Sequence, residues 1–188
     1  IVAGVIYDAA QDECFFAEKG QGAWMNETRM RVSGRRSLSD CIFATGLPSS
    51  GRSDLPQALA DLAQLLPASS GVRNLGAAAL DMAYVAAGRV DGFWGRRLQL
   101  WDIAAGMVIV KEAGGFSESI QPSGDPLQDG TIIAANDQVF APFSKTIRKN
   151  SKFRISISNH IKWHFFGCSI GEVLNIIFKD IVFKSLYS

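Results

Sequence analysis

Hydrophobic and polar residues alternate through the first part of the chain, which is the period-two pattern of half-buried β-strands. Residues 1–8 and 13–18 follow this pattern and are separated by a polar turn. They therefore predict two adjacent antiparallel strands. A glycine turn at residues 20–22 precedes a third short strand at residues 24–25. The beginning of the chain is thus expected to be rich in β-structure.

Further along, the hydrophobic spacing changes to the three or four residues that are typical of a helix packed on one side. Before this change, residues 41–47 predict one more strand, and a loop rich in Ser and Gly follows it at residues 48–54. A helix follows this loop, with Asp54 as its N-cap. The apolar face of that helix consists of Leu55, Leu59, Leu62 and Leu66.

Strands and helices alternate from residue 71 onward. The expected strands cover residues 71–76, 89–95, 115–120 and 131–135. The expected helices cover residues 77–88, a segment headed by Asp102, and a last stretch capped by Asn136 or Asp137 and ending near Lys149. Residues 121–130 are expected to form a loop. This alternation indicates layered α/β architecture and argues against an all-β sandwich.

The composition is that of a soluble globular protein. Of the 188 residues, 47% are hydrophobic and 20% are charged, and the formal net charge is +1. Because Lys and Arg are not clustered, the charge gives no reason to expect binding to nucleic acid or to an anionic membrane. We find no apolar run long enough to cross a membrane and no export signal. A cytoplasmic protein with a small-molecule partner is therefore expected.

The cysteines and histidines give no pattern of a disulfide framework or a metal centre. Cys14, Cys41 and Cys168 are odd in number and lack the spacing of metal ligands. They are expected to be reduced thiols. His160 and His164 have the spacing of a helical metal pair, but no third ligand accompanies them. We interpret that spacing as incidental.

The two ends of the chain differ from the middle. The sequence begins at Ile1 inside a β-rich run, so we expect that further polypeptide preceded it. Residues 151–188 contain no alanine and carry a charge of +3, because five Lys and Arg face two Asp and Glu, which leaves −2 for the remainder. We expect a domain at residues 1–149 and an atypical tail at residues 150–188. This tail is either an appended helix and strand or a segment that is not native to the fold.

The segment LWDIAAGMVIVKEAGG, residues 100–115, places one carboxylate, Asp102, at the head of an apolar helix. Acids are favoured at a helix N-cap, where the carboxylate accepts a backbone hydrogen bond and interacts favourably with the helix dipole. Trp101 and the nearly uncharged residues 103–110 would also hold this acid at the edge of a core. A partly desolvated carboxylate in that position is suited to binding magnesium. These residues alone leave both interpretations open.

Four segments carry a more specific signal because they occur in a characteristic order. Residues 4–26 contain a strand pair followed by a glycine turn, and residues 73–94 contain Arg-x-x-Gly-Ala-Ala-Ala. Residues 101–115 contain Trp-Asp, an apolar helix and Gly-Gly, and residues 131–136 form a final strand. In this order and spacing the chain resembles the inositol monophosphatase family. The resemblance covers about residues 1–149 and does not extend to the tail.

The resemblance implies a layered α/β sandwich that hydrolyses phosphate monoesters such as inositol phosphate with magnesium, and this chain would represent its C-terminal half. In such an enzyme, Asp102 matches the carboxylate that binds a metal and helps to position the attacking water. Gly76, Ala77 and Ala78 match a segment that lies along the substrate's hydroxyl groups, where small residues allow close approach of backbone N–H groups. The resemblance also suggests a homodimer.

The chain also departs from the family pattern in ways that affect its expected activity. The family's other metal ligands, a Glu and an Asp-Pro-(Ile/Leu)-Asp-Gly-Thr loop, belong before Ile1, so we expect the chain as given to be catalytically incomplete. Residues 125–131, DPLQDGT, imitate that loop with one residue inserted, but ordinary turn chemistry explains them. Gly95 stands where relatives commonly have a Glu that binds a substrate hydroxyl. Its loss would weaken recognition of a polyol.

Three functions therefore remain open at this stage. The first is an inositol-monophosphatase-like hydrolase. The second is a related phosphatase that acts on another sugar phosphate or on a nucleotide 3′-phosphate, which the glycine at position 95 would favour. The third is a non-catalytic remnant or interaction module, which the missing ligands and the atypical tail would favour. Assays over several phosphate esters separate the first two functions, and substitution of Asp102 tests the third.

Overall fold

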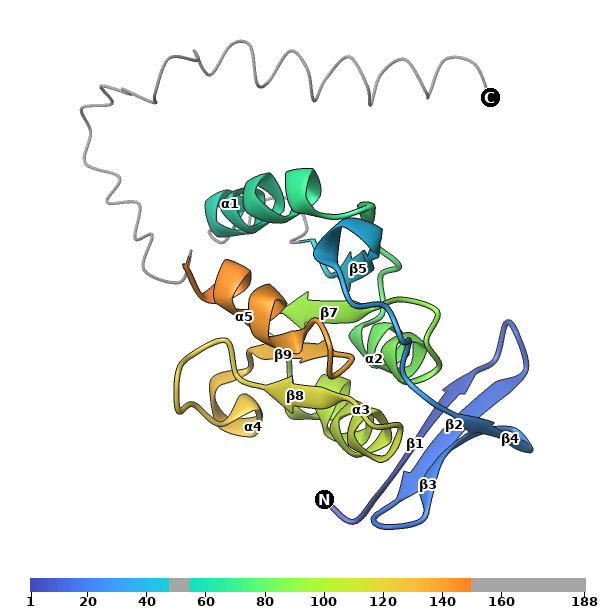
Figure 1. The fold of residues 1–188 in the computed structure, drawn as a ribbon. Helices are drawn as coiled ribbons and strands as arrows, with labels where there is room; N and C mark the ends of the chain where they lie inside the picture. The colour runs from blue at the N-terminus through green and yellow to red at the C-terminus, as the bar shows by residue number, and fades with distance from the viewer. Residues whose placement is uncertain (48–54, 150–188) are drawn as a thin grey trace, which may run out of the picture. The chain divides into compact units, whose positions relative to one another are not determined.

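Two β-sheets with helices between and beside them make up the part of the chain that the computed structural model describes, residues 1–47 and 55–149 (Figure 1). These residues belong to one compact unit. The expected loop at residues 48–54, with its Asp54 cap, lies outside the described residues. The same is true of the tail at residues 150–188, with its two histidines and its cysteine.

The first sheet is antiparallel and has four strands in the order β1-β2-β3-β4. Its strands are β1 (Ala3–Asp8), β2 (Glu13–Glu18), β3 (Gly22–Met25) and β4 (Thr28–Met30). Val5 lies opposite Phe16, and Phe16 lies opposite Trp24. The three strands predicted from the period-two pattern are confirmed. The fourth, with three residues, is too short to show a pattern of its own.

The second sheet has five strands in the order β6-β5-β7-β9-β8. Its strands are β5 (Ile42–Thr45), β6 (Gly71–Arg73), β7 (Gly92–Gly95), β8 (Phe116–Glu118) and β9 (Ile132–Ala135). The first three of these run parallel to one another, whereas β9 runs antiparallel to both of its neighbours. All four residues of β7 and all four of β9 are buried, as expected for central strands covered on both faces.

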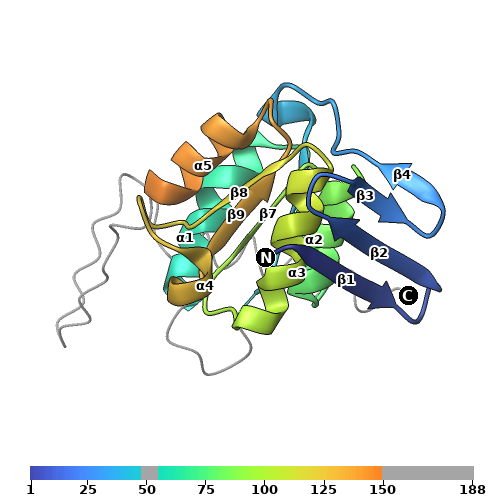
Figure 2. The same ribbon diagram turned by 90° about the horizontal axis from the view of Figure 1, so that it is seen from below.

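Five α-helices lie within the described residues. They are α1 (Leu55–Leu65), α2 (Ala78–Ala86), α3 (Leu100–Glu112), α4 (Pro126–Asp129) and α5 (Phe140–Lys149), with short 3₁₀ helices at Leu38–Asp40 and Leu66–Ala68. Helices α2 and α3 form a layer between the two sheets, whereas α1 and α5 cover the opposite face of the five-stranded sheet (Figure 2). The predicted layered α/β architecture is therefore confirmed. Among the described helices, none is long and apolar enough to cross a bilayer.

Glycines allow the layers to approach closely. A Cβ atom on Gly106 of α3 would lie 2.7 Å from the Cβ atom of Met82 on α2. On the other side of α3, a Cβ atom on Gly4 of β1 would lie 2.8 Å from the Cα atom of Ala105. Larger residues at either glycine would force the layers apart. This contact fixes α3 between the sheet of β1 and helix α2.

Of two predictions about local structure, one was wrong and the other was right in part. Residues 121–130 are not entirely loop, because Asp125 accepts a hydrogen bond from the backbone N–H of Leu127 at 3.0 Å and starts the short helix α4 at Pro126. Asn136 does accept the N–H groups of Gln138 and Val139, at 3.0 and 2.9 Å. It therefore caps a turn, and α5 begins only after that turn. The capping role of Asn136 was thus predicted from the sequence, whereas that of Asp125 was missed.

The two cysteines within the described residues are both free, as expected for reduced thiols. Cys41 is completely buried. Burial, followed by the nearby Asp91 carboxylate, raises the pKa of its thiol to about 12. A thiol with such a pKa carries almost no thiolate at neutral pH, so Cys41 is a packing residue and not a nucleophile.

Candidate active site

The residues predicted to form a site meet at one edge of the five-stranded sheet. Because β5, β6 and β7 are parallel, their carboxyl ends lie at the same edge. Four residues separate the end of β6 from the start of α2, and four separate the end of β7 from the start of α3. Both helix N-termini therefore lie at this edge, where ligands commonly bind in α/β proteins. The fold places Gly76, Ala77, Ala78, Gly95 and Asp102 at or beside it.

Asp102 occupies the third position of α3 and not the N-cap, so the cap prediction was wrong in position. Gln99 is the N-cap, and its side chain accepts a hydrogen bond from the backbone N–H of Asp102. In return, Oδ2 of Asp102 accepts the backbone N–H of Gln99 at 2.8 Å. This reciprocal arrangement is a capping box. Glutamine is not among the preferred caps, which is why sequence reasoning passed over it.

The second carboxylate oxygen of Asp102 is available to a ligand. Among the described residues, Oδ1 has no hydrogen-bond or ion-pair partner. The side chain is half-buried. One oxygen thus fixes the orientation of the carboxylate while the other stays open, which suits a metal or water ligand held on a rigid element. The helix-cap and ligand interpretations are therefore compatible with each other.

The expected burial of Asp102 by Trp101 is wrong. Trp101 is 76% exposed, and its neighbour Leu100 is exposed as well. Both residues lie in the first turn of α3. The apolar run behind them is buried as expected, at Ile103, Gly106 and residues 108–110.

The N-terminus of α2 leaves its backbone donors without a side-chain cap. Ala77 holds the N-cap position in an extended conformation and, lacking a polar side chain, makes no cap hydrogen bond. The first N–H groups of a helix need partners, and they attract anions. Gly76 precedes this position with φ +88, a conformation that favours glycine, and is exposed. The segment can therefore present backbone donors directly to an anionic or hydroxyl-bearing ligand.

Gly95 ends β7 and is buried. A Cβ atom on this residue would lie 2.5 Å from Cδ1 of Leu98 and 3.0 Å from Cζ of Phe93. Leu98 thus fills the space beside Gly95 that a side chain would otherwise occupy. A glutamate at this position would have to displace the end of that leucine side chain.

The loop between β7 and α3 is held on both sides. Nε of Arg96 lies 3.0 Å from Oδ2 of Asp61 on α1, and this aspartate is completely buried. On the other side, the backbone N–H of Leu98 donates to the carbonyl of Gly130 at 2.9 Å. These contacts hold the loop that leads to Asp102. Sequence reasoning missed the Arg96–Asp61 pair because no local pattern joins residues that lie 35 positions apart.

The DPLQDGT segment lies at the same edge, and its carboxylates form turns as expected. Asp125 caps α4. Asp129 accepts hydrogen bonds from Oγ of Ser119 at 2.6 Å and from the backbone N–H of Thr131 at 2.9 Å. Burial acts to raise the pKa of Asp129, but the hydrogen bonds from Ser119 and Thr131 outweigh it and hold the pKa below its ordinary value. This carboxylate is committed to the loop.

Magnesium prefers a near-octahedral set of oxygen ligands. Within residues 1–47 and 55–149, no three or more His, Cys, Asp or Glu side chains are grouped to hold a metal ion. Asp102 supplies one suitable ligand. By themselves, the described residues therefore do not fit a complete magnesium site.

Comparison with known proteins supports the resemblance seen in the sequence. A model of the inositol monophosphatase family matches residues 1–152. The chain is 46% identical over 149 residues to an inositol-1-monophosphatase of Mesorhizobium japonicum, covering 79% of this chain and 56% of that protein. It is also 41% identical to the Nus factor SuhB of Pseudomonas aeruginosa, covering 77% of this chain and 54% of that protein.

Solved structures agree with these matches. The crystal structure of the extragenic suppressor protein SuhB from Bartonella henselae is 46% identical and has a TM-score of 0.75, covering 79% of this chain and 57% of that one. The chain thus spans about half the length of the relatives it matches.

Proposed function

Because this chain belongs to the inositol monophosphatase family, we propose that it contributes to a magnesium-dependent hydrolase that converts an inositol phosphate and water into inositol and phosphate. The observation that carries the proposal is the arrangement at the sheet edge. There, an oriented carboxylate with one open oxygen follows β7 and an uncapped helix N-terminus follows β6, and these two parallel strands lie on either side of β5. This combination suits a phosphate ester together with a cation.

Each part of the edge has a distinct task in this proposal. Oδ1 of Asp102 binds the cation and orients a water, while Oδ2 holds the side chain against the backbone of Gln99. The backbone N–H groups that follow Gly76 and Ala77 bind oxygen atoms of the substrate. Bound magnesium would polarise the phosphoryl oxygens and lower the pKa of a bound water. Asp102 is therefore assigned as a catalytic residue and a metal ligand.

The remaining carboxylates are proposed to come from polypeptide outside the described residues. One described carboxylate does not complete a magnesium site. The matched relatives are longer than the matched region, since only 56% of the Mesorhizobium protein is covered. The 188-residue chain on its own is accordingly expected to hydrolyse no phosphate ester.

The glycine at position 95 favours a second candidate substrate. Neither Gly95 nor Leu98, which occupies the space beside it, can accept a hydrogen bond from a substrate hydroxyl through a side chain. Recognition of inositol would lose a partner for that hydroxyl. Another sugar phosphate or a nucleotide 3′-phosphate is therefore the alternative substrate class. The uncapped N-terminus of α2 serves all of these esters equally.

A non-catalytic role is the competing function. The incomplete ligand set favours it, and so does the similarity to proteins named Nus factor SuhB. We propose hydrolysis because the open oxygen of Asp102 and the uncapped α2 would have no use in a pure interaction module. We further propose that the protein is cytoplasmic and forms a homodimer. Because its net charge is only +1, we also propose that it binds neither nucleic acid nor membrane.

The test is a fusion protein that adds to this chain a segment present in a longer relative. The segment of the Mesorhizobium inositol-1-monophosphatase that precedes the matched region is fused ahead of Ile1 of the 188-residue chain. Phosphate release is measured from inositol 1-phosphate, glucose 1-phosphate and adenosine 3′-phosphate, with and without Mg²⁺. We expect release by the fusion in the presence of Mg²⁺ and none by the chain alone.

Each outcome of this assay separates the candidates. Preferential hydrolysis of the sugar or nucleotide ester would select the second substrate class. A fusion that unfolds cooperatively but hydrolyses none of the esters would contradict the hydrolase proposal. Hydrolysis by the 188-residue chain alone would contradict the proposal that further carboxylates are required.

A further inference from the structure

A pocket formed by other residues than those of the candidate active site lies between α3, α4, strand β8 and the turn that follows β2. Its volume is about 410 Å³, which is within the range of small-molecule sites. Lys111 comes from the last turn of α3, Lys19 follows β2, and Ser117 lies on β8. The pocket therefore collects three hydrogen-bond donors, one from residue 19 and two from residues 111–117.

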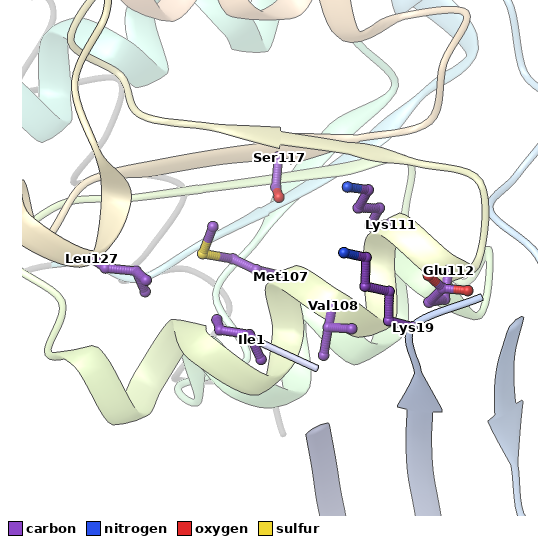
Figure 3. Close-up of a pocket in the computed structure, with 8 residues that line it drawn as sticks. All are labelled: Ile1, Lys19, Met107, Val108, Lys111, Glu112, Ser117 and Leu127. Carbon is purple, nitrogen blue, oxygen red and sulfur yellow. The ribbon is translucent and has the colours of Figure 1, made fainter. Parts of the chain in front are cut away.

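The polar end of the pocket has unused positive charge. Figure 3 shows the side chains of Lys19 and Lys111 extending into the same space, with the hydroxyl group of Ser117 beside it. Within the described part of the chain, neither ammonium group has an ion pair or a hydrogen bond. Two ammonium groups that share one opening repel each other unless an anion lies between them.

The Glu112 carboxylate, which also lines the pocket, offsets only part of the charge of the two lysines. Oε2 of Glu112 accepts the backbone N–H of Gly22 at 3.0 Å and is thereby turned toward the β2–β3 turn. Hydrogen bonds from the backbone of Gly20 and Gly22 hold the pKa of Glu112 below its ordinary value, against a smaller effect of burial, with the two lysines adding to the lowering. Glu112 is thus already bound by two backbone donors.

The other end of the pocket is apolar. Its apolar lining consists of Ile1, Met107, Val108 and Leu127, and Figure 3 shows Leu127 on the side away from the lysines. Val108 is buried, and Met107 and Leu127 are half-buried. A ligand that fits both ends needs a charged group and a short apolar body.

We propose that this pocket binds a small amphipathic anion, whose carboxylate or phosphoryl group lies between Lys19 and Lys111 and whose apolar part rests on Met107, Val108 and Leu127. The anion accepts hydrogen bonds from both ammonium groups and from the hydroxyl group of Ser117. The pocket contains none of the residues Gly76, Ala77, Ala78, Gly95 and Asp102 that were assigned to the candidate active site. It does not depend on the proposed hydrolase activity.

The test uses phenylphosphonate, which has both parts of the expected ligand and carries no ester bond. Binding to the ¹⁵N-labelled 188-residue chain is followed by NMR titration, with inorganic phosphate and benzyl alcohol as probes for the two parts alone. We expect saturable shifts at Ser117 and along the second half of α3. Phenylphosphonate should bind at least tenfold more tightly than either single-part probe.

Amino-acid substitutions show which residues bind phenylphosphonate. Replacing both lysines, K19Q with K111Q, should weaken phenylphosphonate binding at least tenfold. K145Q, which changes an exposed lysine on α5, should leave it unchanged, and so should D102N at the candidate active site. Binding that is unaffected by the double lysine variant would overturn the proposal, and so would binding that is lost in D102N. The absence of saturation would do the same.

Discussion

At the scale of single residues, Asp102 joins two roles that sequence reasoning treated as alternatives. Its Oδ2 atom completes a capping box with Gln99, and its Oδ1 atom has no partner among the described residues. The sequence predicted an important carboxylate at this helix end, but it placed the helix start wrongly. The cause was the cap itself, because a Gln cap carries little signal.

The sequence pattern did not single out Asp81, but the structure gives this carboxylate an unusual environment. It lies in α2, is completely buried, and neither of its carboxylate oxygens has a hydrogen-bond partner. Burial raises its pKa from 3.8 to about 7. Its charged form is therefore costly to keep in the folded protein.

Replacing this residue, D81N, should remove a pH-dependent loss of stability. The pKa of Asp81 is higher in the folded state, so the folded state holds the extra proton between about pH 4 and pH 7. The contribution of Asp81 to stability is therefore complete below pH 4 and lost as the pH rises through 7. Relative to D81N, the free energy of unfolding of the wild type should fall by roughly 3 kcal/mol over this range.

Urea unfolding at several pH values between 4 and 8 checks this expectation. E27Q, which neutralises an exposed acid, serves as the matched control and should follow the wild type. Parallel stability curves for the wild type and D81N would show that Asp81 finds a partner in solution.

At the scale of elements, the sequence predicted long or strongly periodic segments and missed short ones. Alternation identified β1 and β2, and helical spacing identified α1. The expected apolar face of α1 was wrong, however, because Leu55, Leu59 and Leu66 are exposed. Strand β4 and helix α4 have three and four residues, which is too short for either period to appear. Contacts between distant elements, such as Arg96 with Asp61, were beyond reach because they depend on the folded topology.

The close contact between α2 and α3 predicts a strong effect at Gly106. In G106V, the new side chain would overlap Met82, whose Cβ atom lies 2.7 Å from the position of the added Cβ. We expect the free energy of unfolding to fall by about 2 kcal/mol or more. In G34V, by contrast, a Cβ atom meets no other atom within 4 Å, so this variant should change stability little. Thermal unfolding of both variants compares them directly, and equal melting temperatures would show that the helices can separate without cost.

At the scale of the whole molecule, the four-stranded sheet presents an apolar outer face. Val5, Tyr7 and Phe16 are 64%, 58% and 38% exposed. In the described part of the chain, β1 is an edge strand that pairs only with β2. Open edges beside exposed apolar side chains favour association with other chains. The layered architecture could be predicted from the sequence, whereas the extent of this surface required the register of the strands.

The exposed sheet face should cause the 188-residue chain to self-associate. Introducing charge on the facing pair, V5K with F16K, should shift the protein toward monomer at the same concentration. L59K on α1 also changes an exposed hydrophobic residue and should leave association unchanged. Light scattering coupled to gel filtration measures all three proteins. A monodisperse wild-type monomer would contradict this expectation.

Asp102 is proposed to be a metal ligand of a hydrolase and not merely a helix cap. The most direct test of this proposal is Mg²⁺-dependent phosphate release by the fusion protein carrying D102N, with D125N as the matched control. Asparagine retains a capping oxygen at either position, so both variants should keep the stability of the wild type within about 1 kcal/mol. D102N should lower the rate roughly 100-fold or more, whereas D125N should change it little. A D102N protein that folds and keeps the wild-type rate would contradict the account.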